Sequence, residues 1–137
     1  MKILIVDDDN IGLKVVSEFM KPYGETETAS SGVKAMEMIV KAIKKKKPYE
    51  LFLLDIMMPE INGHELLAAI RNMEKEAQDG TNSKIIMMSA LSDADNIMLA
   101  FNGQCDAYLV KPIKMERLYD ELDKIGVKKP SDIDKRH

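Results

Sequence analysis

Short apolar runs alternate with amphipathic segments five times along this chain of 137 residues. Four of the runs are almost wholly apolar, at residues 3–6, 51–54, 85–88 and 107–110. Such runs are typical of strands buried on both faces of a parallel sheet. Glu25–Ala29 alternates, is rich in Thr and is barely apolar, which is typical of an edge strand. Five strand–helix units with short links predict a doubly wound α/β domain, with helices on both faces of a five-stranded parallel sheet.

The segments between the runs carry apolar residues at helical spacing, which predicts five amphipathic helices. These residues are Ile11, Val15, Val16, Phe19 and Met20; Val33, Met36, Ile39, Val40 and Ile43; Leu66, Leu67, Ile70 and Met73; Ala94, Ile97, Met98 and Phe101; and Met115, Leu118, Tyr119, Leu122 and Ile125. In the fourth helix we expect Ile97, Met98 and Phe101 to lie in the core. Leu99 is expected to face a partner.

Polar residues before these segments predict where the helices begin. Ser30 or Ser31 can cap the second helix. Asn62 with Glu65 resembles a capping box for the third helix, and Ser92 with Asp95 resembles another for the fourth. Residues 76–83 are predicted to form a loop, and Gly126 to end the last helix.

The composition limits the class of protein. A chain of this length forms one domain that buries about two-thirds of its unfolded surface. We expect this domain to cover residues 1–126 and a polar tail or linker stub to cover residues 127–137. The net charge of −3 argues against direct binding of nucleic acid. The run Lys44–Lys47 has no aromatic residue within it and is typical of a solvated helix end.

No apolar run reaches the roughly 18 residues of a membrane span, so we expect no membrane association. The single cysteine, Cys105, excludes a disulfide framework, is predicted to be a small buried hydrophobe, and fits a reducing, cytoplasmic compartment.

Polar side chains follow four of the predicted strands: Asp7 and Asp8, Asp55, Ser89 and Lys111. Parallel strands end at the same edge of a sheet, so these side chains should converge. Clustered carboxylates repel one another unless a cation neutralises them, and an all-oxygen site suits Mg²⁺. A carboxylate nucleophile, a divalent ion, a cationic side chain and a hydroxyl are the groups needed to accept a phosphoryl group. Each residue alone also has an ordinary explanation, as a helix cap, a loop hydroxyl or a surface lysine.

The motifs ILIVDDD, LLDIMMPEINGHELL, IIMMSA and YLVKP occur in this order and resemble those of response-regulator receiver domains, the phosphoacceptors of two-component signalling. The resemblance covers residues 2 to about 125. It implies a flavodoxin-like (βα)5 fold with the strand order 2-1-3-4-5, which agrees with a polar second strand at an edge. It also implies a cis peptide bond between Lys111 and Pro112.

The resemblance further implies a role for each acidic residue. Asp55 is the residue that becomes phosphorylated. Asp8 and Asp55 bind Mg²⁺ directly, together with the backbone carbonyl of Met57. Asp7 acts through a metal-bound water molecule.

Three more residues take roles from the same resemblance. Ser89 holds the phosphoryl group, Lys111 pairs with it, and Tyr108 is an aromatic switch that turns inward when Ser89 moves. The implied partners are a histidine kinase or histidine phosphotransfer protein as phosphodonor and an unknown downstream protein as target. The chain is then not an enzyme beyond its own phosphorylation and dephosphorylation, and it is a monomer or a weak phosphorylation-dependent dimer.

Two departures from the family pattern are mild: Asn62 stands where Asp is usual, and Ser89 where Thr is equally common. Met57 and Leu91 flank the predicted site, are both apolar and cannot orient an attacking water molecule. We therefore expect a long-lived aspartyl phosphate. His64 is expected to be a surface residue.

Other classes of protein fit the sequence less well. A haloacid-dehalogenase-type phosphatase would use Asp7 as its nucleophile, but the late acidic residues it needs at a strand end lie here in an amphipathic helix. A calcium-binding loop that starts at Asp7 would place Ile11 and Val15 at ligand positions. The alternative that stays open is a receiver-fold binding module that signals without phosphate.

Overall fold

Strands and helices alternate along the part of the chain that the computed structural model describes, residues 1–80 and 82–131. The elements are β1 (Lys2–Val6), α1 (Asn10–Met20), η1 (Lys21–Tyr23), β2 (Glu25–Ala29), α2 (Gly32–Lys44), β3 (Leu51–Asp55), α3 (Gly63–Ala77), β4 (Lys84–Ser89), α4 (Ala94–Asn102), β5 (Ala107–Val110) and α5 (Met115–Lys124). All neighbouring strands pair in parallel, in the order β2-β1-β3-β4-β5. The predicted fold class, strand order and edge position of Glu25–Ala29 are confirmed.

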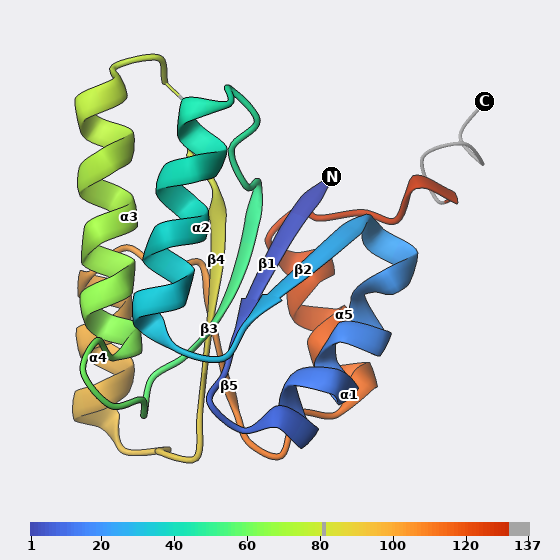
Figure 1. Cartoon of the computed structure of the whole chain (residues 1–137). Coiled ribbons are helices and arrows are strands. Elements are labelled where there is room, and N and C mark those ends of the chain that lie inside the picture. The colour runs from blue at the N-terminus through green and yellow to red at the C-terminus, as the bar shows by residue number, and fades with distance from the viewer. Residues whose placement is uncertain (81, 132–137) are drawn as a thin grey trace.

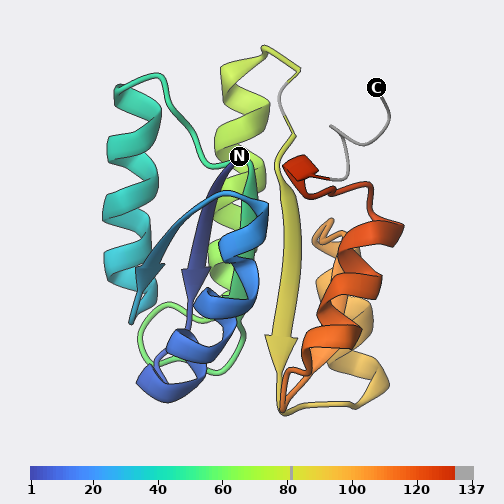
Figure 2. The same ribbon diagram turned by 90° about the vertical axis from the view of Figure 1, so that its right-hand side faces the viewer.

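The sheet lies between two layers of helices. Helices α2, α3 and α4 cover one face, and α1 and α5 cover the other (Figures 1 and 2). Because the strands are parallel and each helix returns the chain to the sheet's starting edge, the carboxyl ends of all strands meet at one edge. That edge holds the polar residues that the sequence singles out.

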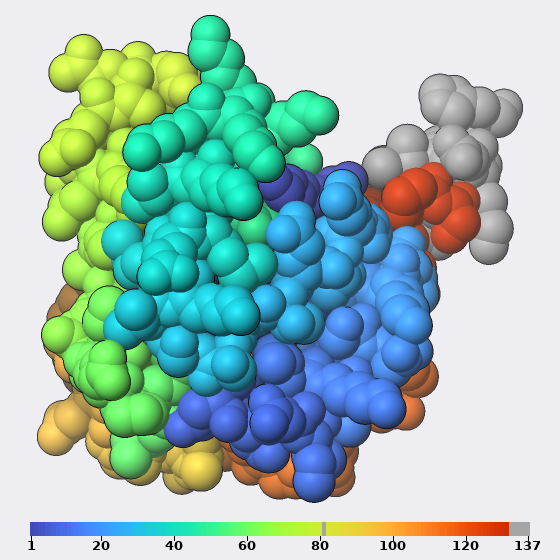
Figure 3. Space-filling model, viewed as in Figure 1, coloured from blue at the N-terminus to red at the C-terminus, as the bar shows by residue number. Residues whose placement is uncertain are grey.

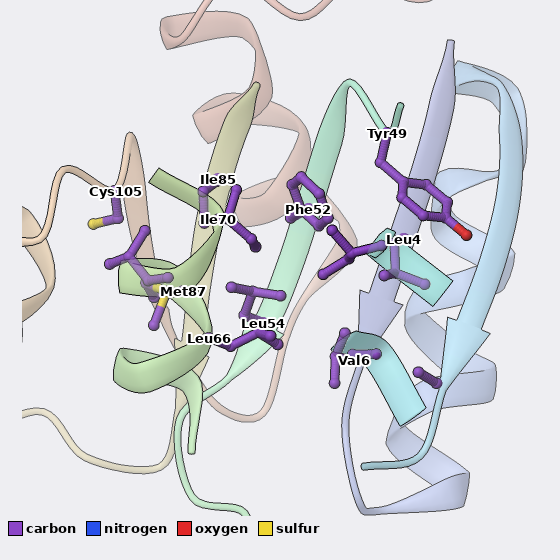
Figure 4. Close-up of a cluster of buried hydrophobic side chains, with 14 of the residues drawn as sticks. Leu4, Val6, Tyr49, Phe52, Leu54, Leu66, Ile70, Ile85, Met87 and Cys105 are labelled. Carbon is purple, nitrogen blue, oxygen red and sulfur yellow. The ribbon is translucent and has the colours of Figure 1, made fainter. Parts of the chain in front are cut away.

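Alternate residues of each central strand enter opposite layers, as the period of two in a strand requires. One layer receives Leu4, Val6, Phe52, Leu54, Ile85 and Met87, which pack against Leu66 and Ile70 of α3 (Figure 4). The other layer receives Ile3, Ile5, Leu51, Leu53, Ile86 and Met88. Cys105 is buried in the first layer, as predicted.

Small residues decide which side of α2 meets the sheet. Its buried residues are Gly32, Ala35, Ile39 and Ala42. A Cβ atom at position 32 would lie 2.4 Å from the carbonyl oxygen of Ile61, so only glycine allows this close approach. The larger apolar residues of the predicted helix face, Val33, Val40 and Ile43, are exposed instead.

The same effect appears in α4 and makes the prediction of its core wrong for Met98 and Phe101, whereas Ile97 is half-buried. Ala100 is the residue of α4 that is fully buried, and its small side chain lets the helix lie close to β5. Met98 and Phe101 were expected in the core but are exposed, as is Leu99. In α1, Leu13, Val16 and Met20 are buried, whereas Ile11 and Val15 are exposed.

The helix caps follow the sequence at two of three places. The side chain of Ser31 accepts a hydrogen bond from the backbone of Lys34, and Asn62 with Glu65 forms the predicted capping box. The capping box of Ser92 and Asp95 is wrong, because α4 begins one residue later than that box requires. Asp93 is therefore its N-cap.

The ends of two segments differ slightly from expectation. α3 continues to Ala77, so the loop after it is shorter than the predicted 76–83. Val127, at the start of the predicted tail, packs in the layer of α1 and α5. Residues 132–137 of that tail lie outside the described residues, and the domain boundary stays a prediction. None of the described helices has the length and apolar character needed to cross a membrane.

A half-buried cluster around Arg71 of α3 ties this helix to the amino ends of β4 and β5. Its guanidinium donates to Glu74, at 2.7 Å, and to Asp106, at 3.0 Å, and it also donates to the backbone carbonyls of Ser83 and Gln104. Asp106 in turn accepts from the backbone N–H of Ile85. The cluster lies at the sheet edge opposite the polar strand ends.

Candidate functional site

Three aspartates meet at the carboxyl edge of the sheet. Asp55 is the last residue of β3, and Asp7 directly follows β1; both side chains are buried. Asp8 is exposed beside them. One carboxylate oxygen from each of the three lies within 4.8 Å of the others. The convergence predicted from the strand ends is therefore observed.

Lys111, which follows β5, supplies a positive charge to this cluster. Its ammonium lies 2.9 Å from an oxygen of Asp7 and 3.3 Å from an oxygen of Asp55. The backbone N–H of Lys111 donates to the carbonyl of Ser89, which aligns the ends of β5 and β4. The peptide bond between Lys111 and Pro112 is cis, as the resemblance implied.

Burial sets the protonation of these groups. Burial first, and then the charge of Asp7, raise the pKa of Asp55 to about 7, although Lys111 acts in the opposite direction. For Lys111, burial lowers the pKa. The hydrogen bond to Asp7 and the charges of the two aspartates outweigh burial, so the pKa of Lys111 is raised. The site thus contains more negative charge than one lysine neutralises.

The loop after Asp55 is fixed at both ends. The backbone N–H of Gly63 donates to the carbonyl of Ile56, and a Cβ atom at position 63 would lie 2.4 Å from the carbonyl oxygen of Asp55. The capping box of Asn62 then starts α3. Because Gly63 has no side chain, the loop can pass close to the end of β3. Met57 lies within the loop with its side chain exposed.

A chain of contacts leads from the carboxyl end of β4 to Tyr108 of β5. Ser89 is fully buried, and its hydroxyl accepts a hydrogen bond of 3.0 Å from the backbone N–H of Leu91. The carbonyl of the same Leu91 accepts a hydrogen bond of 2.7 Å from the hydroxyl of Tyr108. Burial raises the pKa of Tyr108, which keeps this hydroxyl protonated. The backbone of Leu91 therefore contacts both Ser89 and Tyr108.

The acidic cluster has the chemistry of a magnesium site. Its donors are carboxylate oxygens, which Mg²⁺ prefers to nitrogen or sulfur. One of the three carboxylates is exposed, which leaves room for the water molecules that Mg²⁺ retains. The residues present therefore fit the predicted ion.

The family model for the response regulator receiver domain matches residues 3–123. The chain belongs to this family. The receiver domain is 36% identical over 124 residues to the regulatory protein VanRB of Enterococcus faecalis, and the match covers 90% of this chain and 51% of VanRB. It is 31% identical over 148 residues to histidine kinase 3 of Arabidopsis thaliana, covering 96% of this chain and 14% of the kinase. The receiver domain thus spans about half the length of the first relative and a small part of the second.

Solved structures agree with the family and the fold. A CheY-like receiver domain protein of Methanospirillum hungatei has 27% sequence identity and a TM-score of 0.73, covering 90% of both chains. The receiver domain of the Arabidopsis thaliana histidine kinase CKI1, solved in complex with Mg²⁺ and BeF3⁻, has 25% identity and a TM-score of 0.79, covering 93% of this chain and 90% of that one.

One contact near the site was not predicted from the sequence. His64 at the start of α3 was expected on the surface, but it is half-buried. Its Nε2 lies 3.3 Å from the side-chain oxygen of Asn96 in α4, and its Nδ1 is buried without a hydrogen-bond partner among the described residues. Both residues line a hollow of about 420 Å³ beside Met57 and Leu91. Nothing in the sequence pairs positions 64 and 96, because only the packing of α3 against α4 brings them together.

Proposed function

We propose that this receiver domain accepts a phosphoryl group on Asp55 from a phosphohistidine of a histidine kinase or histidine phosphotransfer protein. The observation that carries the proposal is the meeting of three carboxylates within 4.8 Å of one another beside the ammonium of Lys111. Burying two aspartates side by side costs stability. Aspartates that only cap helices can stay exposed and avoid this loss of stability. The burial of Asp7 and Asp55 together therefore favours a role in chemistry over a role as helix caps.

In the proposed reaction, an ionised oxygen of Asp55 attacks the phosphorus in line with the phosphorus–nitrogen bond. The new oxygen–phosphorus bond forms as the phosphorus–nitrogen bond breaks, and the imidazole leaves with the electron pair of the broken bond. Lys111 stabilises the charge on the phosphoryl oxygens, and Ser89 donates a hydrogen bond to one of them. Mg²⁺ held by Asp8, Asp55 and the backbone carbonyl of Met57, with Asp7 acting through water, would neutralise the negative charges that meet here.

An apolar surface beside the carboxylates suits the docking of the phosphodonor. Ile11 and Val15 of α1 are exposed and line a hollow of about 430 Å³ together with Asp7, Lys111 and Pro112. A phosphohistidine must approach Asp55 from solvent, and this hollow is lined by both residues of the Lys111–Asp7 ion pair, whose ammonium also lies 3.3 Å from Asp55. We therefore place the donor on α1 and the segment after β5.

The proposed switch uses the contacts of Leu91. When Ser89 moves toward a phosphoryl group, the hydrogen bond to the backbone of Leu91 is lost or shifted, and Tyr108 must follow because it donates to the same residue. This movement changes the surface formed by α4, β5 and α5. Met98, Leu99 and Phe101 are exposed on α4 and are the proposed contacts for a downstream protein.

Incubation with acetyl phosphate and Mg²⁺, followed by intact-mass measurement, tests the proposal. We expect the mass of one phosphoryl group on the wild type and none on Asp55→Asn, whereas Asp9→Asn, which keeps a helix-capping side chain, is phosphorylated normally. Undiminished addition to Asp55→Asn would reject Asp55 as the acceptor. No addition to the wild type would favour the alternative, a receiver-fold module that binds its partner without phosphate.

A further inference from the structure

Exposed apolar side chains gather at several places on the receiver domain, and the proposed function leaves one of them unused. Those on α1 lie at the donor surface, and those on α4, β5 and the start of α5 lie at the proposed output surface. The remaining group lies on α2, where Val33, Val40 and Ile43 are 39%, 37% and 45% exposed. Figure 3 shows α2 on the outer surface beside α3.

The exposed residues of α2 form a continuous stripe. Val33, Met36, Val40 and Ile43 follow one another at spacings of three, four and three residues, the spacing with which one helix packs along another. Over ten residues the stripe is about 15 Å long. Met36 is the half-buried member of the stripe, and it also packs against the core. The stripe therefore presents a ridge that fits a second helix of about three turns.

Ile43 joins this stripe to a hollow of about 370 Å³ between α2 and α3. The hollow has an apolar floor, which includes Ile39, Phe52 and Ile70, and Lys46 stands at its border. It exists because α2 and α3, with 13 and 15 residues, project beyond the amino ends of the strands (Figure 1). Stripe and hollow together form a groove, which we name the α2–α3 groove.

The charge around the α2–α3 groove is positive, although the whole chain carries a net charge of −3. Lys41 and Lys44 lie beside the stripe together with Glu37, and Lys46 lines the hollow together with Glu74 and Asp79. Lys45 and Lys47 are the neighbours of Lys46 in the chain, and all five lysines are exposed, so positive charge predominates. No carboxylate in residues 1–80 or 82–131 forms an ion pair with these lysines. Glu74, which lines the hollow, is already bound to Arg71 and Ser83.

We propose that the α2–α3 groove binds an amphipathic helix of a partner protein, with a large apolar side chain in the hollow and Asp or Glu residues facing Lys41 and Lys44. Binding of a helix in a groove through apolar anchors explains the stripe, and the unpaired lysines select an acidic partner. Two copies of this surface would repel each other through their lysines. A membrane surface fits poorly, because the apolar floor is recessed between two helices. The hollow, which takes the large apolar side chain, lies at the sheet edge opposite Asp55, so binding there does not require the proposed phosphorylation.

The test uses the full chain labelled with ¹⁵N and a synthetic helical peptide of about 14 residues, long enough for the stripe. The peptide carries Leu at spacings of three and four and Glu on both flanks, and a control peptide carries Lys in place of Glu. We expect the acidic peptide to shift backbone amide signals of α2 and of the second half of α3, and the basic peptide to leave them unchanged.

Substitutions make the test specific. Val40→Glu, at an exposed position, should abolish peptide binding, whereas Leu99→Glu on α4 should leave it unchanged. The double substitution Lys41→Glu with Lys44→Glu should weaken the acidic peptide about tenfold and favour the basic one. Circular dichroism checks that each variant is folded.

Several results would overturn the proposal: equal binding of both peptides, signal shifts confined to α4 and α5, or unchanged binding to Val40→Glu. Binding to vesicles of anionic lipid that exceeds binding to the acidic peptide would show a membrane surface instead. Dimer formation through α2 in sedimentation experiments would show a second copy as the occupant.

Discussion

Lys111 donates a hydrogen bond of 2.9 Å to Asp7, a shorter contact than the 3.3 Å between its ammonium and Asp55. The lysine that is proposed to pair with a phosphoryl group on Asp55 is thus held mainly by the neighbouring aspartate. In the absence of metal, Lys111 is the cation that allows two buried carboxylates to lie side by side. For the proposed phosphorylation, this position already holds the ammonium 3.3 Å from Asp55.

Lys111→Met should therefore destabilise the metal-free protein. Removing one partner from a mostly buried charge cluster leaves Asp7 and Asp55 uncompensated, and we expect the free energy of unfolding to fall by about 2 kcal/mol at pH 8 in EDTA. Urea unfolding measures this difference. Mg²⁺ should restore most of it, because a divalent cation replaces the lost charge.

The matched control for this prediction is Lys114→Met, which changes an exposed lysine three residues away. It should alter the free energy of unfolding by less than about 0.5 kcal/mol. An equal loss in the two variants would show that Lys111 acts as an ordinary surface lysine.

Asp55 should make stability fall as the pH rises. The pKa of Asp55 is about 7 in the folded chain, against 3.8 for an aspartate in the unfolded chain. Between about pH 4 and about pH 7 the folded chain therefore holds a proton that the unfolded chain has released, and the free energy of unfolding decreases through this window. Asp55→Asn cannot release this proton. Without metal at pH 8 we expect it to be about 2 kcal/mol more stable than the wild type, with the difference vanishing near pH 4.

Chemical unfolding across this pH range in EDTA measures the effect, and Asp9→Asn should keep the wild-type profile. Mg²⁺ should stabilise the wild type more than Asp55→Asn. Parallel pH profiles for wild type and Asp55→Asn would mean that Asp55 is ionised throughout the range.

The sequence predicted the acidic site because its geometry follows from topology alone. In a parallel sheet, Asp7, Asp55, Ser89 and Lys111 must reach the same edge once their strands are recognised, and the apolar runs identify those strands without ambiguity. The roles of these residues, and the metal coordination, stay predictions. They depend on chemistry that packing does not determine.

The faces of the helices were harder to predict, because small residues rather than large ones decide them. Ala35 and Ala42 in α2, and Ala100 in α4, bring their helices close to the sheet and turn Val40 and Met98 outward. A pattern of large apolar residues does not reveal this. Contacts between distant residues, such as Arg71 with Asp106, depend on the final packing and leave no local signal.

Arg71→Ala should cause a large loss of stability, although the residue lies far from the acidic site. Its side chain is 12% exposed and bridges two carboxylates and two backbone carbonyls. Removing it leaves Glu74 without its cation and Asp106 with only the 4.0 Å contact to Lys84, so we expect the free energy of unfolding to fall by about 3 kcal/mol. Arg71→Lys should recover only part of this, because an ammonium cannot reproduce the planar fork of a guanidinium.

Urea unfolding of these variants is compared with that of Arg117→Ala, which removes an exposed arginine from α5 and should change little. Phosphorylation of folded Arg71→Ala by acetyl phosphate should be normal, since the cluster lies at the opposite sheet edge. A loss below about 1 kcal/mol would contradict the structural role of this cluster.

Met57 should determine how long the phosphoryl group stays on Asp55. An apolar side chain two residues after the acceptor cannot orient a water molecule for attack on the phosphorus, which predicts slow hydrolysis. Met57→Gln introduces groups that bind and orient water, and we expect phosphate loss to become about tenfold faster or more. Met98→Gln is a matched control, because Met98 is 61% exposed and Met57 is 60% exposed, yet Met98 lies on α4 away from Asp55.

Intact-mass measurements after removal of acetyl phosphate give both rates. Equal rates in the two variants would show that the lifetime is set by other groups, and loss of the wild-type phosphate within seconds would show that an apolar residue at position 57 gives no protection.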